Sequence, residues 1–232
     1  MPPRTFAVGD IHGCRVALSS LVASIAPAAE DTLVFLGDYI DRGPDAAGVI
    51  DALLQLRGCC NTVFLKGNHE EMMLDARREP GSRLAWCRYG GTQTLDSYGD
   101  GAFPGCVPDS HWEFIHAGRN FLETDTHILV HAPIRSALPV ARQGSHDWRW
   151  GFEVPSESHV SGKTVVCGHA TQHDGLPMFV RGTYFIDTAA CHGLWLTALE
   201  LGEGRAVQAR DDGDVRVLAA ADIRKTVLPE GR

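Results

Sequence analysis

The chain has 232 residues, and 21 lysines and arginines against 29 aspartates and glutamates give a net charge of −8 with neutral histidines. A hydrophobic content of 44% with 22% charged residues excludes an intrinsically disordered chain and is typical of a globular protein. The acidic balance argues against nucleic-acid binding through a broad basic surface. We expect one domain over residues 1–224, followed by a tail over residues 225–232.

The composition also predicts where the protein works. The chain lacks an apolar run of about 18 residues, so we expect no membrane-spanning helix and no membrane partner. Residues 1–6 lack the apolar segment of a secretory signal. The seven cysteines are odd in number and irregularly spaced, and two of them are adjacent. We therefore expect reduced thiols and a cytoplasmic protein.

The first third of the chain alternates short apolar runs with helical patterns. Residues 6–8, 32–36 and 62–65 are apolar runs that predict buried strands. Between them, apolar residues at helical spacing over 18–25 predict one amphipathic helix, and residues 44–54 predict a second that opens near a proline. The order strand, helix, strand, helix, strand is typical of a sheet with crossover helices.

The rest of the chain predicts a second sheet. Residues 79–118 are irregular and glycine-rich, and we expect helices and loops inserted over the sheet. Further strands are expected at residues 128–130, 164–167, 183–186, 194–201, 206–209 and 215–218. The strands after residue 160 suggest a second sheet packed on the first. The predicted fold class is α/β, with two mixed β-sheets packed as a sandwich and flanked by helices.

Polar clusters follow five of these strands. They are Gly-Asp-Ile-His-Gly (9–13), Gly-Asp-Tyr-Ile-Asp-Arg-Gly (37–43), Gly-Asn-His-Glu (67–70), His-Ala (131–132) and Gly-His (168–169). Ligands of α/β proteins bind beyond the carboxyl ends of the strands. Glycines there let the backbone turn sharply and approach a ligand closely. We predict that the five clusters meet at one edge of the sheets.

The side chains in these clusters have the chemistry of a metal centre. Imidazole nitrogens, carboxylates and an amide oxygen together suit Mn²⁺, Fe, Zn²⁺ or Co²⁺ better than Ca²⁺. Six donors are too many for one ion with an open position, but they suit two ions about 3.5–4 Å apart. The predicted ligands are Asp10, His12, Asp38, Asn68, His131 and His169, with Asp38 shared. A water between two such ions loses a proton near neutral pH and becomes a nucleophile.

These motifs resemble those of the calcineurin-like metallophosphoesterases. Within that superfamily they resemble the phosphoprotein phosphatase branch, and especially small bacterial and phage serine/threonine phosphatases. The similarity covers about residues 6–197, and the motifs at 37–43 and 67–70 are the most specific. The segment 89–99 also resembles a segment of the bacterial enzymes.

The resemblance implies roles for individual residues. One metal would be held by Asp10, His12 and Asp38, and the other by Asp38, Asn68, His131 and His169. His69 matches the residue that protonates the leaving alkoxide, and Asp41 matches its partner. Arg42 matches a phosphate-binding arginine, and Asn68 is also expected to contact the phosphate.

Some positions depart from the family pattern. A second phosphate-binding arginine is expected in a Trp-x-Arg setting, where Arg149 fits if one residue is missing, with Arg135 as the alternative. His192 replaces an aromatic residue near the site. It either contacts the substrate or packs in the fold, and we favour packing.

The sequence therefore predicts a metal-dependent serine/threonine protein phosphatase that hydrolyses phosphate monoesters, with Mn²⁺ as the first choice of metal and a phosphorylated protein or peptide as the partner. A symmetrical bis(5'-nucleosyl)-tetraphosphatase shares the motifs and stays open as an alternative. A catalytically silent metal-binding scaffold is more remote, because no predicted ligand or acid is missing.

Overall fold

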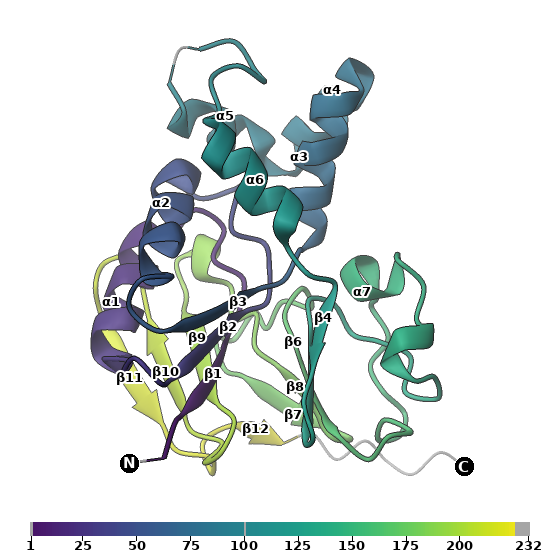
Figure 1. The fold of residues 1–232 in the computed structure, drawn as a ribbon. Coiled ribbons are helices and arrows are strands. Elements are labelled where there is room, and N and C mark those ends of the chain that lie inside the picture. The colour runs from purple at the N-terminus through teal and green to yellow at the C-terminus, as the bar shows by residue number, and fades with distance from the viewer. Residues whose placement is uncertain (1, 100, 226–232) are drawn as a thin grey trace.

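The computed structural model describes residues 2–99 and 101–225, which form two six-stranded sheets packed as a sandwich (Figure 1). In the first sheet the strands follow the order β11 (Val215–Leu218), β10 (Ala206–Ala209), β9 (Leu196–Glu200), β1 (Thr5–Val8), β2 (Thr32–Phe35) and β3 (Asn61–Phe64). In the second sheet the order is β12 (Arg224–Lys225), β7 (Met178–Val180), β8 (Thr183–Phe185), β6 (Thr164–Cys167), β5 (His127–Val130) and β4 (Phe121–Glu123). Both sheets combine parallel and antiparallel pairs, as the sequence predicts.

The late strands are divided between the two sheets, which corrects one expectation. β6 and β8 lie in the second sheet, but β9, β10 and β11 extend the first sheet because β9 pairs antiparallel with β1. The alternation of apolar residues predicts a strand, but it does not name the neighbour with which the strand pairs. Lys225, which the sequence places in the tail, is part of β12, and residues 226–232 lie outside the described residues.

Both faces of the central strands are buried, which explains their continuous apolar runs. In β1, Ala7 points between the sheets, where it joins a cluster that includes Leu129 and Val166 of the second sheet. Phe6 and Val8 belong to the core on the other face of β1. The strands thus form the middle of a layered structure.

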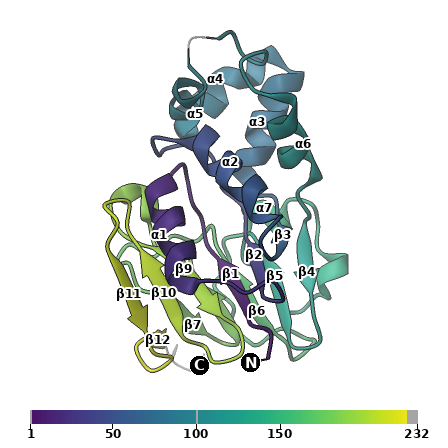
Figure 2. The same ribbon diagram turned by 60° about the vertical axis from the view of Figure 1, so that its left-hand side comes forward.

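The two sheets are covered differently on their outer sides: helices pack on the first sheet, whereas the second carries a short helix and loops (Figures 1 and 2). α1 (Arg15–Ile25) and α2 (Ala46–Leu56) pack on the first sheet through buried residues at helical spacing, as their sequences predict. α7 (Asp147–Trp150) lies beside the second sheet, close to a short 3₁₀ turn, η3 (Val140–Arg142). Another 3₁₀ turn, η4 (Ala190–His192), precedes β9.

A group of helices stands over the end of the sandwich (Figures 1 and 2). It consists of α3 (Asn68–Arg78), η1 (Pro80–Ser82), α4 (Arg83–Trp86), the π-helical turn η2 (Cys87–Gly91), α5 (Thr92–Ser97) and α6 (Asp109–Ala117). The part from η1 to α6 lies within residues 79–118, which the sequence predicts as helices and loops over the sheet, whereas α3 precedes that segment. We call the whole group the helical cap.

The state of the cysteines and the character of the helices can be compared with the expectations of reduced thiols and of no membrane-spanning helix. The cysteines are free thiols in the structure: Cys14, Cys59, Cys60, Cys87, Cys106, Cys167 and Cys191. Within residues 2–99 and 101–225, no helix has the length and apolar character that a membrane crossing requires. The thiols therefore match the expectation of reduced cysteines.

Arg4 and Asp31 connect the start of β1 with the loop before β2. The Asp31 carboxylate accepts hydrogen bonds from the Arg4 backbone N–H at 2.7 Å, from Arg4 Nε at 3.0 Å and from the Ala28 N–H at 2.9 Å. The bonds from Arg4 lower the pKa of Asp31 from 3.8 to about 2, although burial opposes the shift.

The depressed pKa of Asp31 predicts a pH-dependent contribution to stability. A carboxylate whose pKa is lower in the folded state stabilises the fold above its unfolded pKa, and this contribution is lost as the pH falls through the folded pKa. We expect the wild type to be more stable than Asp31→Asn above pH 3.8, with a difference that shrinks as the pH falls to about 2. Urea unfolding of both proteins across this range measures it, and a constant difference would contradict the prediction.

Candidate active site

The loops after five strands bring the predicted ligands together. β1, β2 and β3 of the first sheet and β5 and β6 of the second end at the same side of the sandwich, beneath the helical cap (Figure 1). The side chains that follow these strands are largely buried: Asp10, His12, Asp38, Asn68, His131 and, with partial exposure, His169. The structure thus places all six predicted ligands on this edge.

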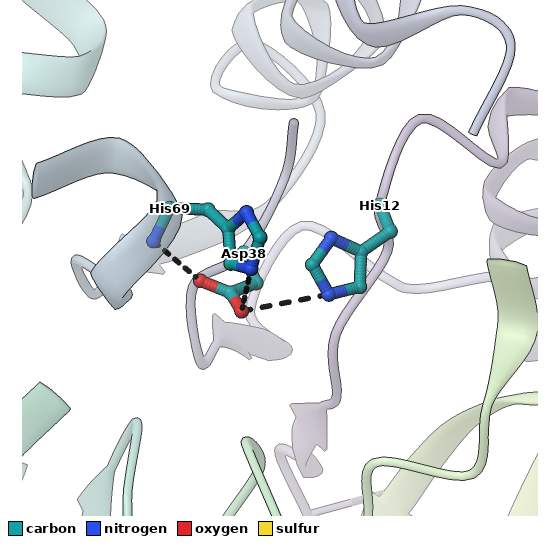
Figure 3. Close-up of side chains that lie close together, drawn as sticks. All are labelled: His12, Asp38 and His69. Atoms are coloured by element: carbon teal, nitrogen blue, oxygen red, sulfur yellow. Dashed lines mark hydrogen bonds and ion pairs between the residues drawn. The ribbon is translucent and has the colours of Figure 1, made fainter. Parts of the chain in front are cut away.

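Asp38 lies at the centre of this group, where the sequence places the shared ligand. Its Oδ2 lies 3.5 Å from His12 Nε2 and 3.9 Å from His69 Nε2, and Figure 3 shows both imidazoles directed at this one oxygen. Its Oδ1 lies 3.5 Å from His131 Nε2. Asp38 is therefore common to two possible metal-binding groups, one with His12 and His69 and one with His131 and His169.

The backbone orients the two buried imidazoles toward Asp38. His12 Nδ1 lies 2.8 Å from the Ile40 carbonyl oxygen, and His131 Nδ1 lies 3.1 Å from the Leu36 carbonyl oxygen. A carbonyl can only accept, so each Nδ1 carries the proton and each Nε2 keeps its lone pair. Burial lowers the pKa of both histidines, which favours the neutral form that binds metals.

Asn68 occupies the second group. Its Oδ1 lies 3.0 Å from His131 Nε2 and 3.1 Å from His169 Nδ1. Burial lowers the pKa of His169 to about 3, so this ring is also neutral at ordinary pH. The amide oxygen and the two imidazoles can face one cation together.

Asp10 stands slightly apart from these groups. Its carboxylate accepts hydrogen bonds from the His169 backbone N–H at 3.2 and 3.0 Å. Burial and the neighbouring carboxylates of Asp187 and Asp38 raise the pKa of Asp10 well above its ordinary value. A nearby cation would offset these like charges, so the position of Asp10 suits a metal ligand.

The donor set fits two divalent cations. Burial raises the pKa of Asp38, but the histidines that face it, His131, His69 and His12, outweigh burial and hold that pKa well below its usual range. Neutral imidazoles, an ionised carboxylate and an amide oxygen in one buried cluster are the ligands of transition-metal centres. The residues present would hold the two ions on either side of Asp38.

The backbone at the site is strained and closely packed. Asp38, His12 and His169 have φ values of 51°, 47° and 59°, in the left-handed region that non-glycine residues rarely adopt. A Cβ on Gly67 would lie 2.0 Å from Asp38 Oδ1, and a Cβ on Gly168 would lie 2.0 Å from Asp10 Oδ1. The glycines in the motifs are thus required by the close approach of the carboxylates.

His69 and Asp41 form a buried pair. His69 Nδ1 lies 2.6 Å from Asp41 Oδ2, and neither side chain is more than 1% exposed. Burial lowers the pKa of His69, but the negative charges of Asp38 and Asp41 outweigh burial and raise that pKa above its ordinary value. The pair has the geometry of an imidazole general acid held by a carboxylate.

Of the predicted phosphate-binding arginines, only Arg42 contacts this cluster. Its Nη1 and Nη2 lie 2.9 Å from His12 Nε2 and His69 Nε2, respectively. Arg149 is buried instead against Glu71, with Nε and Nη2 at 2.9 and 2.7 Å from Glu71 Oε1. Arg135 lies 3.3 Å from Asp147 on the surface. A phosphate would have to compete with these carboxylates, so neither arginine is placed as the sequence predicts.

A groove opens beside Arg42. It has a volume of about 590 Å³, and its lining includes Arg42, Arg88, Tyr89, Gln93 and His192. His192 is exposed and faces this groove, so the expectation that it packs in the fold is wrong. His192 is the last residue of the turn η4, which has left-handed residues on both sides.

Glu70 accepts hydrogen bonds from the backbone of the loop that carries Asp38, and the sequence motifs alone do not indicate this role. Its Oε2 accepts hydrogen bonds from the backbone N–H groups of Asp38 and Gly67 at 2.9 Å, and Oε1 accepts from the Tyr39 N–H at 2.8 Å. The side chain has no exposed surface. Glu70 thus links the start of α3 with the loop that carries Asp38.

Removal of the Glu70 carboxylate is expected to be costly. Glu70→Ala leaves three buried N–H groups without their acceptor, at about 1–3 kcal/mol each, so the free energy of unfolding should fall by at least about 3 kcal/mol. Asp75→Ala, on the exposed face of the same helix, should change it by less than about 1 kcal/mol. Denaturant unfolding of both variants tests this, and equal effects would show that the three bonds do not stabilise the fold.

Comparison with known proteins identifies the fold family. The sequence profile described as calcineurin-like phosphoesterase matches residues 3–185, which include all six predicted ligands. The chain is 44% identical over 87 residues to a serine/threonine-protein phosphatase 1 of Salmonella typhimurium, covering 37% of this chain and 38% of that protein. It is 36% identical over 87 residues to a symmetrical bis(5'-nucleosyl)-tetraphosphatase of Pectobacterium carotovorum, covering 35% of this chain and 30% of that protein.

A solved structure agrees at the level of the fold. The cold-active protein-tyrosine phosphatase of a psychrophilic Shewanella species superposes with a TM-score of 0.64 at 17% identity, covering 93% of this chain and 80% of that one. The matches to the two curated relatives span less than two fifths of their lengths. The family profile, in contrast, extends over most of the sequence, including the six predicted ligands and the pair of His69 and Asp41. The chain belongs to the calcineurin-like phosphoesterase family.

Proposed function

We propose that this chain is a metal-dependent serine/threonine protein phosphatase that hydrolyses phosphate monoesters of proteins or peptides. The observation that carries the proposal is the pair of His69 and Asp41, 2.6 Å apart, beside the cluster around Asp38. A serine or threonine alkoxide is a poor leaving group and needs a proton, which this pair is placed to deliver. The likeness to a bacterial serine/threonine-protein phosphatase supports the same reading.

The residues divide the work between binding and proton transfer. Two divalent cations, proposed to be Mn²⁺ with Fe, Zn²⁺ or Co²⁺ as alternatives, would supply positive charge and a water of lowered pKa. Arg42 presents two Nη atoms at the cluster and pairs with phosphate oxygens. Once Arg42 has turned from His69 Nε2 to the phosphate, protonated His69 would give the proton on Nε2 to the leaving oxygen. Asp41 holds the ring through Nδ1 and stabilises its charge.

The groove beside Arg42 supports testing the alternative function, hydrolysis of a symmetrical dinucleoside tetraphosphate. Arg88 and Tyr89 line this groove, so a second cation and an aromatic ring lie next to the site. A further phosphate and a base of a symmetrical dinucleoside tetraphosphate have the charge and the flat surface that these groups bind. The likeness to a symmetrical bis(5'-nucleosyl)-tetraphosphatase points the same way.

A comparison of substrates tests the proposal. The purified chain with Mn²⁺ is assayed on a phosphoserine peptide, a phosphotyrosine peptide and diadenosine tetraphosphate, and kcat/KM is compared. We expect the phosphoserine peptide to be the best substrate. A clear preference for the tetraphosphate, with a rise in its KM in Arg88→Gln, would replace the proposal by the alternative. Bound metal without turnover on any substrate would favour a silent scaffold.

We also propose that the protein works in the cytoplasm. The free thiols support this, because a reducing compartment keeps cysteines unpaired. The partner is proposed to be a phosphorylated protein or peptide, with no nucleic acid or membrane partner.

A further inference from the structure

We propose that Thr94 and Trp86 are positioning residues for the acid pair, and that the cap segment between them holds Asp41 and Arg42 in their working geometry. The inference rests on the proposed role of His69 as the general acid. Both residues belong to the helical cap, about fifty positions further along the chain than Asp41. Each is buried, with 0% exposure for Thr94 and 1% for Trp86.

Thr94 holds Asp41 through two hydrogen bonds of one hydroxyl. Its Oγ1 accepts from the Asp41 backbone N–H at 2.8 Å and donates to Asp41 Oδ1 at 2.6 Å. A single hydroxyl group therefore fixes both the main chain and the carboxylate of Asp41. Valine has the same shape as threonine but can make neither bond.

Trp86 acts on the other oxygen of the same carboxylate. Its Nε1 donates to Asp41 Oδ2 at 2.8 Å, and this is the oxygen that lies 2.6 Å from His69 Nδ1. With Thr94 on Oδ1, three donors surround the Asp41 carboxylate. Because these hydrogen bonds engage both carboxylate oxygens in a buried site, they fix the orientation of the Asp41 carboxylate. The carboxylate in turn orients the His69 ring.

The segment between the two residues also holds Arg42. The Gly90 carbonyl accepts a hydrogen bond from the Arg42 backbone N–H at 3.1 Å. Gly90 has φ 109°, and a Cβ there would lie 2.6 Å from the Arg42 nitrogen. At Gly91, a Cβ would lie 2.6 Å from the Trp86 ring. The two glycines therefore let the segment lie directly against Trp86 on one side and Arg42 on the other.

The backbone of Asp41 and Arg42 needs such support. Their φ values are 71° and 66°, so two consecutive non-glycine residues adopt left-handed conformations. Such residues persist only where the surroundings hold them. Thr94 and Gly90 provide backbone hydrogen bonds to these two residues, one each. The cap segment thus holds the backbone of Asp41 and Arg42 in this conformation.

A pair of substrates separates positioning from general stabilisation. Hydrolysis of a phosphoserine peptide needs a proton on the leaving alkoxide, whereas 4-nitrophenyl phosphate releases an anion that needs none. We expect Thr94→Val to lower kcat on the peptide about tenfold and to change kcat on 4-nitrophenyl phosphate by less than about twofold. Trp86→Phe should act in the same direction, and Thr94→Ser should restore the peptide activity.

A double variant and a matched control complete the test. In His69→Asn the acid is gone, so adding Thr94→Val should have no further effect on the peptide. Ser97→Ala is the control, because Ser97 Oγ donates to the Thr94 carbonyl at 2.7 Å and joins α5 to α2 through the Ala47 N–H. It loosens the same helix without removing a bond to Asp41, and both substrates should respond equally.

The outcomes separate the two proposals. If Thr94→Val slows both substrates by the same factor, or keeps its full effect in His69→Asn, the positioning role is wrong while the phosphatase reaction stands. If the wild type with Mn²⁺ cleaves neither substrate, the proposed function itself fails. Metal content measured on each variant should equal that of the wild type, since Thr94 and Trp86 contact Asp41 through the bonds described and Asp41 is not a predicted ligand.

Discussion

Asp38→Asn is expected to reduce turnover by at least about a thousandfold without unfolding the protein. Asp38 is common to both candidate metal groups, and it carries the negative charge that faces His12, His69 and His131. Asparagine keeps the shape but loses that charge, and the stabilisation that two cations give a phosphoryl transition state amounts to several kcal/mol. Asn68→Ala should act in the same direction.

Two measurements accompany the rate for Asp38→Asn. Metal content by atomic emission should fall below that of the wild type, and circular dichroism should show the same secondary structure. Asp75→Asn makes the same chemical change on the exposed face of α3 and should leave both rate and metal content unchanged. Full turnover by Asp38→Asn with two metals bound would refute a shared carboxylate at this position.

His69→Asn is expected to lower the rate while leaving metal binding intact. Loss of a general acid costs about 10²–10⁴-fold, and the cost should be largest for phosphoserine, whose alkoxide needs the proton. Metal binding by this variant distinguishes two roles of His69, because His69 Nε2 also lies 3.9 Å from Asp38 Oδ2, within one of the two possible metal-binding groups. If His69→Asn strips metal from the protein, His69 is a ligand rather than the acid.

The pKa of His69 adds a pH dependence to the same test. Because Asp38 and Asp41 raise that pKa against the effect of burial, the protonated acid should persist above the ordinary titration range of histidine. In the wild type, kcat on the phosphoserine peptide should therefore decline only at higher pH. The decline should be absent in His69→Asn, and an unchanged profile in that variant would assign the alkaline limb to another group.

Local patterns predict the strands well but not their partners. The runs at 164–167, 206–209 and 215–218 coincide with β6, β10 and β11, because each carries enough apolar or alternating residues to be recognised alone. Which sheet each strand joins depends on pairing between distant segments, such as Ala7 with Leu199. The short strands β4, β7 and β12 have two or three residues and give too little pattern to detect.

α3 shows how a polar helix is missed. Its sequence, Asn-His-Glu-Glu-Met-Met-Leu-Asp-Ala-Arg-Arg, has a weak apolar face, so the periodicity does not mark it. The available signal is electrostatic. Glu70 and Glu71 lie in the first turn and Arg77 and Arg78 in the last, which suits the helix dipole.

The site divides in the same way. The ligand candidates stand at strand ends, and the parallel strands within each sheet bring such positions to one edge, while the packing of the two sheets brings the two edges together. Thr94 and Trp86 come from the cap, and their contact with Asp41 depends on how the cap folds over the sheet. Arg149 has a side chain suited to binding phosphate, but its guanidinium forms an ion pair with Glu71 instead. Pairing between side chains distant in sequence is decided by the tertiary structure.

The candidate ligands come from both halves of the sandwich, and this has a consequence for the life of the protein. Asp38 and Asn68 follow strands of the first sheet, whereas His131 and His169 follow strands of the second. Ions bound among them would cross-link the two layers, so the free energy of metal binding would add to the free energy of folding. A shortage of metal would then lower activity in two ways. The site would lack its ions, and the less stable chain would be degraded faster by proteases.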